Sequence, residues 1–133
     1  MHFRVDPAGP ASPSEQLGDQ VRFAVAAGRL TAGSRVPSLR ALAAEVRVNP
    51  NTVGRAWREL EREGVLEARR GEGMFVAADA GPVCRAAVAR AMAERIGRAV
   101  AEARAGGLGA EEIQELVQTS LDAWEGTFEG EQS

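Results

Sequence analysis

Two helix starts and one helix stop lie between residues 37 and 64, and their order is that of a helix-turn-helix. Ser38 can begin the first helix, because its hydroxyl can accept one of the unpaired N–H groups of a first turn. Asn49 followed by Pro50 restarts a helix, since Asn is a good cap and Pro lacks only an N–H that would be unpaired there. Gly64 can end this second helix in a left-handed conformation. These signals predict two short helices joined by a tight turn.

The first predicted helix begins after Pro37 and Ser38 and ends near Arg47. Its apolar residues recur at steps of three and four, which is the spacing of one buried helix face. These residues are Leu39, Leu42, Ala43 and Val46. Arg40 falls off this face, so we expect its guanidinium to be exposed.

The second predicted helix, residues 50–63, has one apolar and one polar face. The apolar face consists of Val53, Ala56, Trp57 and Leu60. The polar face consists of Asn51, Arg55, Arg58 and Arg62. An ordinary solvated surface helix would show the same periodicity. The Ser-capped helix directly before it favours a recognition helix, whose polar face enters the major groove of DNA.

A β-hairpin is predicted after the second helix, with strands at Val65–Arg69 and Met74–Val76. Glycines in its turn permit a positive φ and a close approach of the backbone to another molecule. Arginines at the end of the first strand suit contact with DNA phosphates or the minor groove. The candidate contact residues of the hairpin are Arg69, Arg70, Gly71 and Gly73. The alternative is a plain hairpin that only covers the core.

The sequence resembles the GntR family of bacterial transcription regulators, in particular its YtrA-like branch. The segments that carry this resemblance are P-S-E-Q-L at 13–17, P-S-L-R-A-L-A at 37–43, V-N-P-N-T-V at 48–53, L-E-R-E-G-V-L at 60–66 and G-E-G-M-F-V at 71–76. F-R-V-D-P at 3–7 is similar to the amino-terminal lead of the YtrA-like branch. The resemblance implies a winged helix-turn-helix that binds a palindromic operator as a homodimer.

The resemblance also implies residues that contact DNA. It places Arg40 in the helix before the recognition helix, and it places Asn49, Asn51 and Thr52 at the start of the recognition helix. The wing-tip glycine of the family corresponds to Gly73. With the residues taken from the helix faces, the candidate DNA-contacting residues are Ser38, Arg40, Asn49, Asn51, Thr52, Arg55, Arg58, Arg69, Arg70, Gly71 and Gly73. This chain departs from the family at the wing, where Glu72 replaces the frequent Lys or Arg.

The net charge of −3 is unusual for a DNA-binding protein, but the charge is unevenly distributed. Residues 20–75 carry a net charge of +4, whereas residues 100–133 carry −7. The predicted DNA-binding region is therefore basic although the chain is acidic. The one cysteine, Cys84, excludes an internal disulfide and is expected to be a small core residue in a reducing cytoplasm.

Other classes of function find little support in the sequence. With one His, one Cys and no Tyr, the chain offers no recognisable catalytic or metal-ligating motif, so we expect neither an enzyme nor a metal or cofactor. No apolar run approaches the roughly 18 residues of a membrane span. The amino terminus lacks the apolar segment of a signal peptide. A cytoplasmic protein that does not interact with membranes is expected.

Two further helices are predicted after a linker at residues 77–81. The first begins at Pro82 and ends near Ala105, and the second extends from Ala110 to about Trp124, before an acidic tail. Glycines between them predict an antiparallel helical hairpin. Two amphipathic helices bury too little surface alone, so we expect a second copy of the chain to cover them. The expected dimerisation residues are Val88, Met92, Ile96, Ile113, Leu116, Val117, Leu121 and Trp124.

The predicted fold is therefore mainly α with a small β-hairpin, in three parts. Residues 1–76 form the winged helix-turn-helix, residues 77–81 the linker, and residues 82–133 the dimerisation hairpin. Packing of the hairpin onto the winged helix is the alternative to dimerisation. The predicted function is a homodimeric, sequence-specific DNA-binding regulator, expected to be a repressor. The alternative is a winged-helix adaptor that binds protein. The sequence specifies no small-molecule effector.

Overall fold

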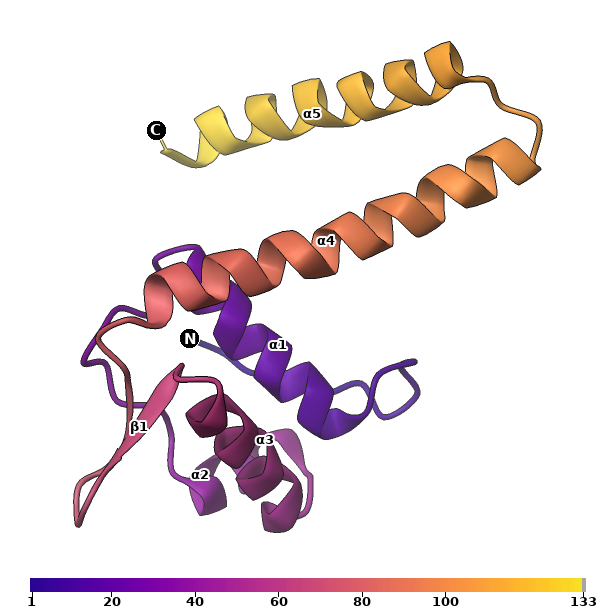
Figure 1. The fold of residues 1–133 in the computed structure, drawn as a ribbon. Helices are drawn as coiled ribbons and strands as arrows, with labels where there is room; N and C mark the ends of the chain where they lie inside the picture. Colours follow the sequence, from indigo (N-terminus) through magenta and orange to yellow (C-terminus); the bar gives the residue numbers. More distant parts are fainter. Residues whose placement is uncertain (133) are drawn as a thin grey trace. The chain divides into compact units, whose positions relative to one another are not determined.

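The computed structural model describes the backbone of residues 1–132 and the side chains of residues 1–124 (Figure 1). The chain divides into two compact units, Met1–Arg90 and Ala91–Ser133. The elements in chain order are α1 (Pro13–Ala26), α2 (Leu39–Val46), α3 (Pro50–Arg62), β1 (Leu66–Arg69), β2 (Gly73–Val76), α4 (Ala80–Ala105) and α5 (Ala110–Gln132). The predicted fold class, a winged helix-turn-helix followed by two helices, is confirmed.

The helix starts of the first unit form as the sequence predicts. The Ser38 hydroxyl accepts a hydrogen bond from the Ala41 N–H at 3.2 Å, and α2 begins directly after this cap. The Asn49 side-chain oxygen accepts from the Asn51 N–H at 2.8 Å, and Pro50 is the first residue of α3. Between the two helices, Arg47 takes the left-handed conformation with a φ of 58°. This conformation reverses the chain within a few residues and so positions α3 across α2.

The predicted apolar face of α2 is only partly buried. Leu39 is 39% exposed, whereas Leu42 is fully buried and Ala43 is 4% exposed. Leu39 is the first residue of α2 and lines two small hollows together with Met74 of the wing. The predicted apolar face of α2 is therefore buried at Leu42 and Ala43, partly buried at Val46 and exposed at Leu39.

Both strands of the hairpin begin one residue away from their predicted starts. Its first strand begins at Leu66 instead of Val65, and its second strand begins at Gly73 instead of Met74. The strands pair antiparallel with Leu66 opposite Val76 and Arg69 opposite Gly73. Val65 is buried and accepts a hydrogen bond from the Ala77 N–H at 2.9 Å.

The wing contains a third extended segment that the sequence did not indicate. Residues 33–36 hydrogen-bond to the free edge of β2, with the Val36 N–H donating to the Met74 carbonyl at 3.0 Å and the Val76 N–H donating to the Ser34 carbonyl at 2.8 Å. Arg35 stands opposite Phe75 in this pairing. The segment before α2 is thereby attached to the wing.

The core of the first unit draws side chains from every one of its elements. Trp57 of α3 is 2% exposed, and its indole N–H donates to the Pro37 carbonyl at 3.2 Å. The ring of Phe3 meets the Trp57 ring edge to face, with centroids 6.1 Å apart. This aromatic contact attaches the amino-terminal segment to α3.

Two glutamines of α1 hold the amino-terminal segment along that helix. The Gln20 amide accepts from the Arg4 N–H at 2.9 Å and donates to the Arg4 carbonyl at 2.5 Å. The Gln16 amide makes the same pair of bonds with the backbone of Asp6, both at 2.8 Å. Because Gln16 and Gln20 are one helical turn apart, they pair with alternate residues of an extended chain.

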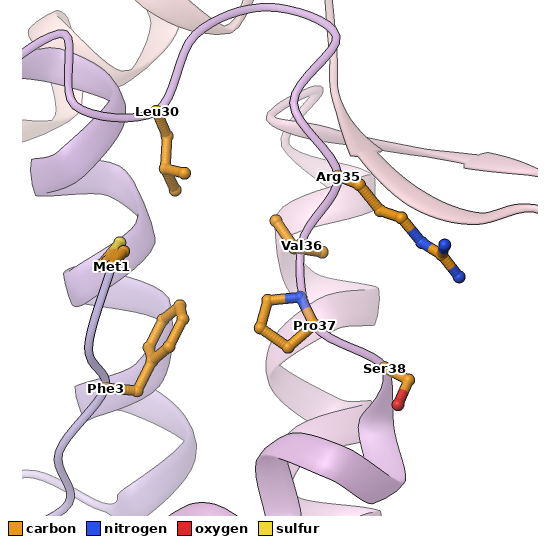
Figure 2. A pocket seen from close by; sticks show the side chains of 7 residues that line it. All are labelled: Met1, Phe3, Leu30, Arg35, Val36, Pro37 and Ser38. Atoms are coloured by element: carbon orange, nitrogen blue, oxygen red, sulfur yellow. The ribbon is translucent and has the colours of Figure 1, made fainter.

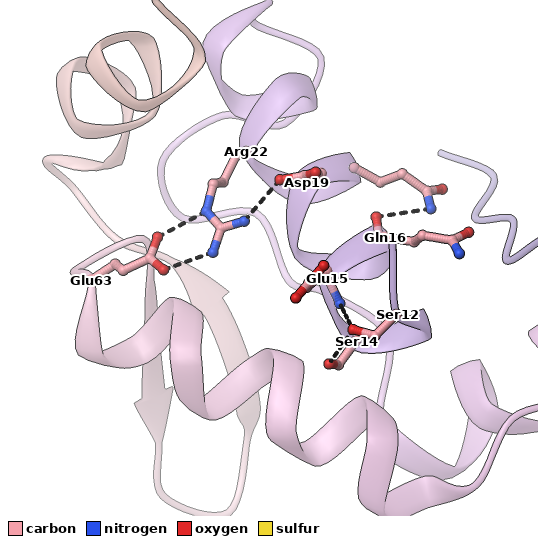
Figure 3. Close-up of polar contacts among 8 residues, drawn as sticks. Ser12, Ser14, Glu15, Gln16, Asp19, Arg22 and Glu63 are labelled. Atoms are coloured by element: carbon pink, nitrogen blue, oxygen red, sulfur yellow. Dashed lines mark hydrogen bonds and ion pairs between the residues drawn. The ribbon is translucent and has the colours of Figure 1, made fainter. Parts of the chain in front are cut away.

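A bidentate ion pair connects α1 to the end of α3 (Figure 3). Arg22 donates to the two carboxylate oxygens of Glu63 at 2.8 and 2.6 Å, and it contacts Asp19 at 3.1 Å. Hydrogen bonding to Glu63 is the main cause that raises the pKa of the Arg22 guanidinium, and burial opposes it. The pair fixes the angle at which α3 crosses α1.

The start of α4 belongs to the core of the first unit. α4 begins at Ala80, two residues before the predicted start at Pro82. Ala80 and Cys84 are fully buried, so the expectation that Cys84 is a core residue is confirmed. Burial also raises the pKa of the Cys84 thiol. The early start follows from tertiary packing, because residue 80 fills a place in the core that no local helix signal reveals.

The second unit contains the remainder of α4, the glycine-containing loop and α5. Gly107 has a φ of 94°, and α5 begins at Ala110 as predicted. Its backbone is helical to Gln132, beyond the expected end near Trp124, and the side chains of the predicted acidic tail lie outside the described residues. Among the described residues, the backbones of α4 and α5 hardly approach each other. In the part of the chain that the structure describes, no helix is long and apolar enough for a membrane span.

Candidate nucleic-acid interface

The polar face of α3 is exposed as predicted. Asn51, Arg55 and Arg58 are exposed, and Thr52 is partly buried. Neither Arg55 nor Arg58 forms an ion pair within the described residues. Arg62, which the sequence places on the same face, pairs with Glu59 on its own helix. The α3 face therefore presents two uncompensated positive charges and one compensated charge.

The two uncompensated arginines of α3 stand on opposite flanks of that helix. Arg55 lines a hollow of about 470 Å³ on the α1 side, together with Glu15 and Asp19. Arg58 lines a smaller hollow of about 140 Å³ on the wing side, with Leu39 and Met74. The exposed face of α3 is therefore bounded by α1 on one side and by α2 and the wing on the other.

The buried glycine of α3 faces the Arg58 side chain and the first turn of α2. A Cβ built on Gly54 would lie 3.3 Å from the Arg58 guanidinium and 3.8 Å from the Leu39 side chain. The first distance needs a small movement of the flexible Arg58 side chain, and the second is an ordinary van der Waals contact. Gly54 thus lies where α3 contacts the first residue of α2.

The caps of α2 and α3 use the oxygens of two candidate contact residues. The Ser38 and Asn49 side-chain oxygens each accept a backbone N–H of the helix they begin. The Ser38 hydroxyl proton and the Asn49 amide N–H groups remain available as donors. Arg40, the second residue of α2, is exposed and has no ion pair within the described residues.

The candidate residues of the wing differ in their surroundings. The Arg69 guanidinium lies 4.1 Å from the centroid of the Phe75 ring and 3.3 Å from a Glu67 oxygen. Arg70 is exposed and has no such partner among the described residues. Gly71 and Gly73 have φ values of 76° and 113°, as expected for the turn. Arg69 is thus held against the sheet, whereas Arg70 extends from the turn.

A hollow of about 430 Å³ separates the amino-terminal segment from the chain that leads into α2 (Figure 2). Met1, Phe3 and Leu30 line one side, and Val36 and Pro37 line the other (Figure 2). The lining is mostly apolar, and Figure 2 shows the Arg35 side chain extending away from Leu30 and Phe3. Nothing in this hollow resembles a catalytic centre. Among the described residues, no group of His, Cys, Asp and Glu side chains is placed to hold a metal ion.

A helix-turn-helix whose second helix has an exposed basic face, followed by a β-sheet wing, defines the winged helix-turn-helix class of proteins. Comparisons with known proteins narrow this class. The family model described as "Bacterial regulatory proteins, gntR family" matches residues 13–76, from the start of α1 to the end of β2. The transcriptional repressor YtrA of Bacillus subtilis is 30% identical to this chain over 116 residues, which make up 87% of this chain and 89% of YtrA. The chain belongs to the GntR family, whose members are transcription regulators and not enzymes.

Two further similarities agree with this assignment. The helix-turn-helix regulator YhcF of Bacillus subtilis is 42% identical over 62 residues, and this match spans 47% of the chain and 51% of YhcF. A GntR family transcriptional regulator from Listeria monocytogenes has a similar structure, with a TM-score of 0.71 at 26% identity. That similarity covers 86% of this chain and 98% of the Listeria protein, so it includes the helices after the wing.

Proposed function

We propose that this chain is a transcription regulator that binds a palindromic DNA operator as a homodimer and represses transcription from it. The exposed face of α3 is the observation that carries the proposal. It combines Asn51, an amide that can pair with a base edge, with the uncompensated charges of Arg55 and Arg58. Amide and guanidinium groups are the side chains that most often read bases in the major groove.

The proposed DNA contacts are of two kinds, to base edges and to phosphates, and the position of each side chain decides its kind. Asn51 and Thr52, at the start of α3, reach base edges, because the amino-terminal part of a recognition helix enters the groove most deeply. Arg40 and Arg58 contact phosphates on the side of α2 and the wing. Arg55 contacts DNA on the α1 side. Contacts to phosphates position the protein, and contacts to base edges provide specificity.

The capping residues and the turn of the wing complete the proposed contact surface. Ser38 and Asn49 donate from their free hydrogens at the starts of α2 and α3. Arg70 and Gly71 approach the DNA backbone or minor groove from the turn of the wing. Arg69 adds a positive charge close to the sheet, and its ion pair with Glu67 reduces the effect of that charge.

Exposed apolar side chains in the second unit support a homodimer. Ile96 is 54% exposed, Leu116 is 55% exposed and Leu121 is 52% exposed. Val117 and Trp124 are exposed to a similar extent, whereas Met92 and Ile113 are partly buried, as is Val88 near the end of the first unit. An apolar surface of this kind favours association, and a second copy supplies a surface of the same character. Two linked heads would bind the two halves of a palindrome about 34 Å apart on one DNA face.

The repressor assignment rests on the similarity to YtrA, which is described as a transcriptional repressor and aligns with 87% of this chain. The DNA target places the protein in the bacterial cytoplasm. The proposal includes no cofactor and no membrane partner.

Binding to labelled DNA from upstream of the protein's own gene, measured over a series of salt concentrations, tests the proposal. Each neutralised phosphate contributes about −0.9 to the slope of log affinity against log salt for double-stranded DNA. Several phosphate contacts from two heads therefore predict a steep negative slope and a preference for upstream DNA over unrelated DNA. A winged-helix adaptor that binds only protein would show neither the slope nor the preference.

A further inference from the structure

The segment before α2 places one arginine on the outer face of the wing. Residues 33–36 pair with β2, and side chains alternate between the two faces of such a sheet. Val36 is 3% exposed and points into the core, so Arg35 points outward. Arg35 stands beside Phe75, on the same face as Arg69.

The glycine opposite Arg69 provides the surface on which the Arg35 side chain lies. A Cβ built on Gly73 would lie 3.1 Å from Nε and 3.3 Å from Nη2 of Arg35. The guanidinium therefore lies against the Gly73 backbone, and a Cβ at this position would make it shift by a few tenths of an ångström. In contrast, a Cβ on Gly71 in the same turn would meet no atom within 4 Å.

The charge of Arg35 is uncompensated among the described residues, since no ion pair involves it. Arg69 on the same face is paired with Glu67. Arg35 and Gly73 also line a small hollow of about 190 Å³ together with Ser38 and Leu39 of the α2 start. Arg35 thus lies between the wing and the first turn of α2, the two places from which the proposed function requires contact with the DNA backbone.

We propose that Arg35 binds a DNA phosphate between the wing and α2, and that Gly73 holds its guanidinium in place for this contact. The inference rests on the proposed function, because it assigns a further residue to the same DNA-binding surface. An arginine held flat on a backbone presents several N–H donors in a fixed geometry, which suits a phosphate. Because a phosphate contact carries no sequence information, Arg35 contributes to affinity and orientation and not to base choice.

The test compares Arg35→Ala and Arg35→Lys with Arg29→Ala, which removes another exposed arginine without an ion pair among the described residues. The full chain is titrated with upstream DNA and with unrelated DNA over the same salt series. Arg35→Ala should weaken both complexes on the order of tenfold and make the salt slope about 1.8 less steep, because it removes one phosphate contact from each of the two heads. Arg35→Lys should keep the wild-type slope, because it keeps the charge. Arg29→Ala should behave as wild type.

A second comparison tests the role of Gly73. Gly73→Ala and Gly71→Ala both strain a backbone with positive φ, but only the first adds a Cβ that crowds the Arg35 guanidinium. Gly73→Ala should therefore weaken DNA binding more than Gly71→Ala does, and this difference should disappear when Arg35 is already Ala. Thermal unfolding of each variant confirms that it is folded.

Two results overturn the inference, and they are distinguishable. If wild type binds DNA with a steep slope and Arg35→Ala binds equally well with the same slope, Arg35 does not contact a phosphate although the proposed function holds. If wild type shows no salt-dependent DNA binding, the proposed function fails and the inference fails with it.

Discussion

The ion pair between Arg22 and Glu63 yields a quantitative prediction for stability. Its guanidinium and carboxylate are 18% and 31% exposed, so the pair is neither fully buried nor at the surface. Exposed pairs contribute about 0.2–1 kcal/mol, whereas removal of one partner of a buried pair costs about 3–5 kcal/mol. We therefore expect Arg22→Ala to lower the free energy of unfolding by about 2 kcal/mol, between these two limits.

The expected loss is large enough to measure by thermal unfolding. For a chain of this size, about 1 kcal/mol corresponds to a change in Tm of roughly 4 °C, so Arg22→Ala should lower Tm by roughly 8 °C. Arg29→Ala, which removes an exposed arginine, is the matched control and should change Tm by no more than about 2 °C. Both measurements should be made at the same protein concentration, because association of the chains stabilises the folded state.

A double-mutant cycle with Glu63→Ala isolates the interaction itself. The coupling free energy between the two substitutions should be at least about 1 kcal/mol, because two charge-assisted hydrogen bonds are lost together. A coupling near zero, with Arg22→Ala as stable as the control, would refute the view that this pair fixes α1 against α3.

Three other experiments test separate parts of the account. Leu116→Glu should dissociate the homodimer in sedimentation experiments, whereas Gln114→Glu, which also adds a charge to α5, should not; equal association of both variants would place the interface elsewhere. Arg40→Ala and Arg55→Ala should each weaken operator binding by about 1–3 kcal/mol in a DNA titration. The Tm of both variants should stay near that of wild type. Unchanged binding by both would show that the contact surface is misassigned. The Cys84 thiol should react with a thiol reagent only as the protein unfolds, because it is buried and its pKa is raised; rapid reaction of the native protein would contradict its place in the core.

The features predicted correctly from the sequence are those that depend on residues close together in the chain. The caps at Ser38 and Asn49 and the glycine stop at Gly64 are local hydrogen-bonding and backbone features, and each forms where it was predicted. The exposed face of α3 follows from the helical period alone, so Arg55 and Arg58 could be assigned to it without a structure.

The sequence analysis missed features that depend on residues distant in the chain. Arg35 gains its position from a strand pairing with Phe75, and a segment of four residues carries too little alternation to reveal such a pairing. Ala80 is helical and buried because it packs in the core of the first unit, among residues distant in the chain. Arg62 was predicted on the polar face of the second helix and Arg69 as a contact residue of the hairpin, but their pairing with Glu59 and Glu67 depends on side-chain geometry that spacing only partly specifies.

The central claim is that two copies of this chain place two recognition helices on one palindromic operator. Footprinting on the DNA upstream of the protein's own gene tests it most directly. The account predicts two protected half-sites related by a two-fold axis, about one helical turn apart, on the same face of the DNA. It also predicts that Leu116→Glu requires a much higher protein concentration for the same protection, because its two heads bind independently. Protection of a single site of no symmetry, unchanged by Leu116→Glu, would contradict the account.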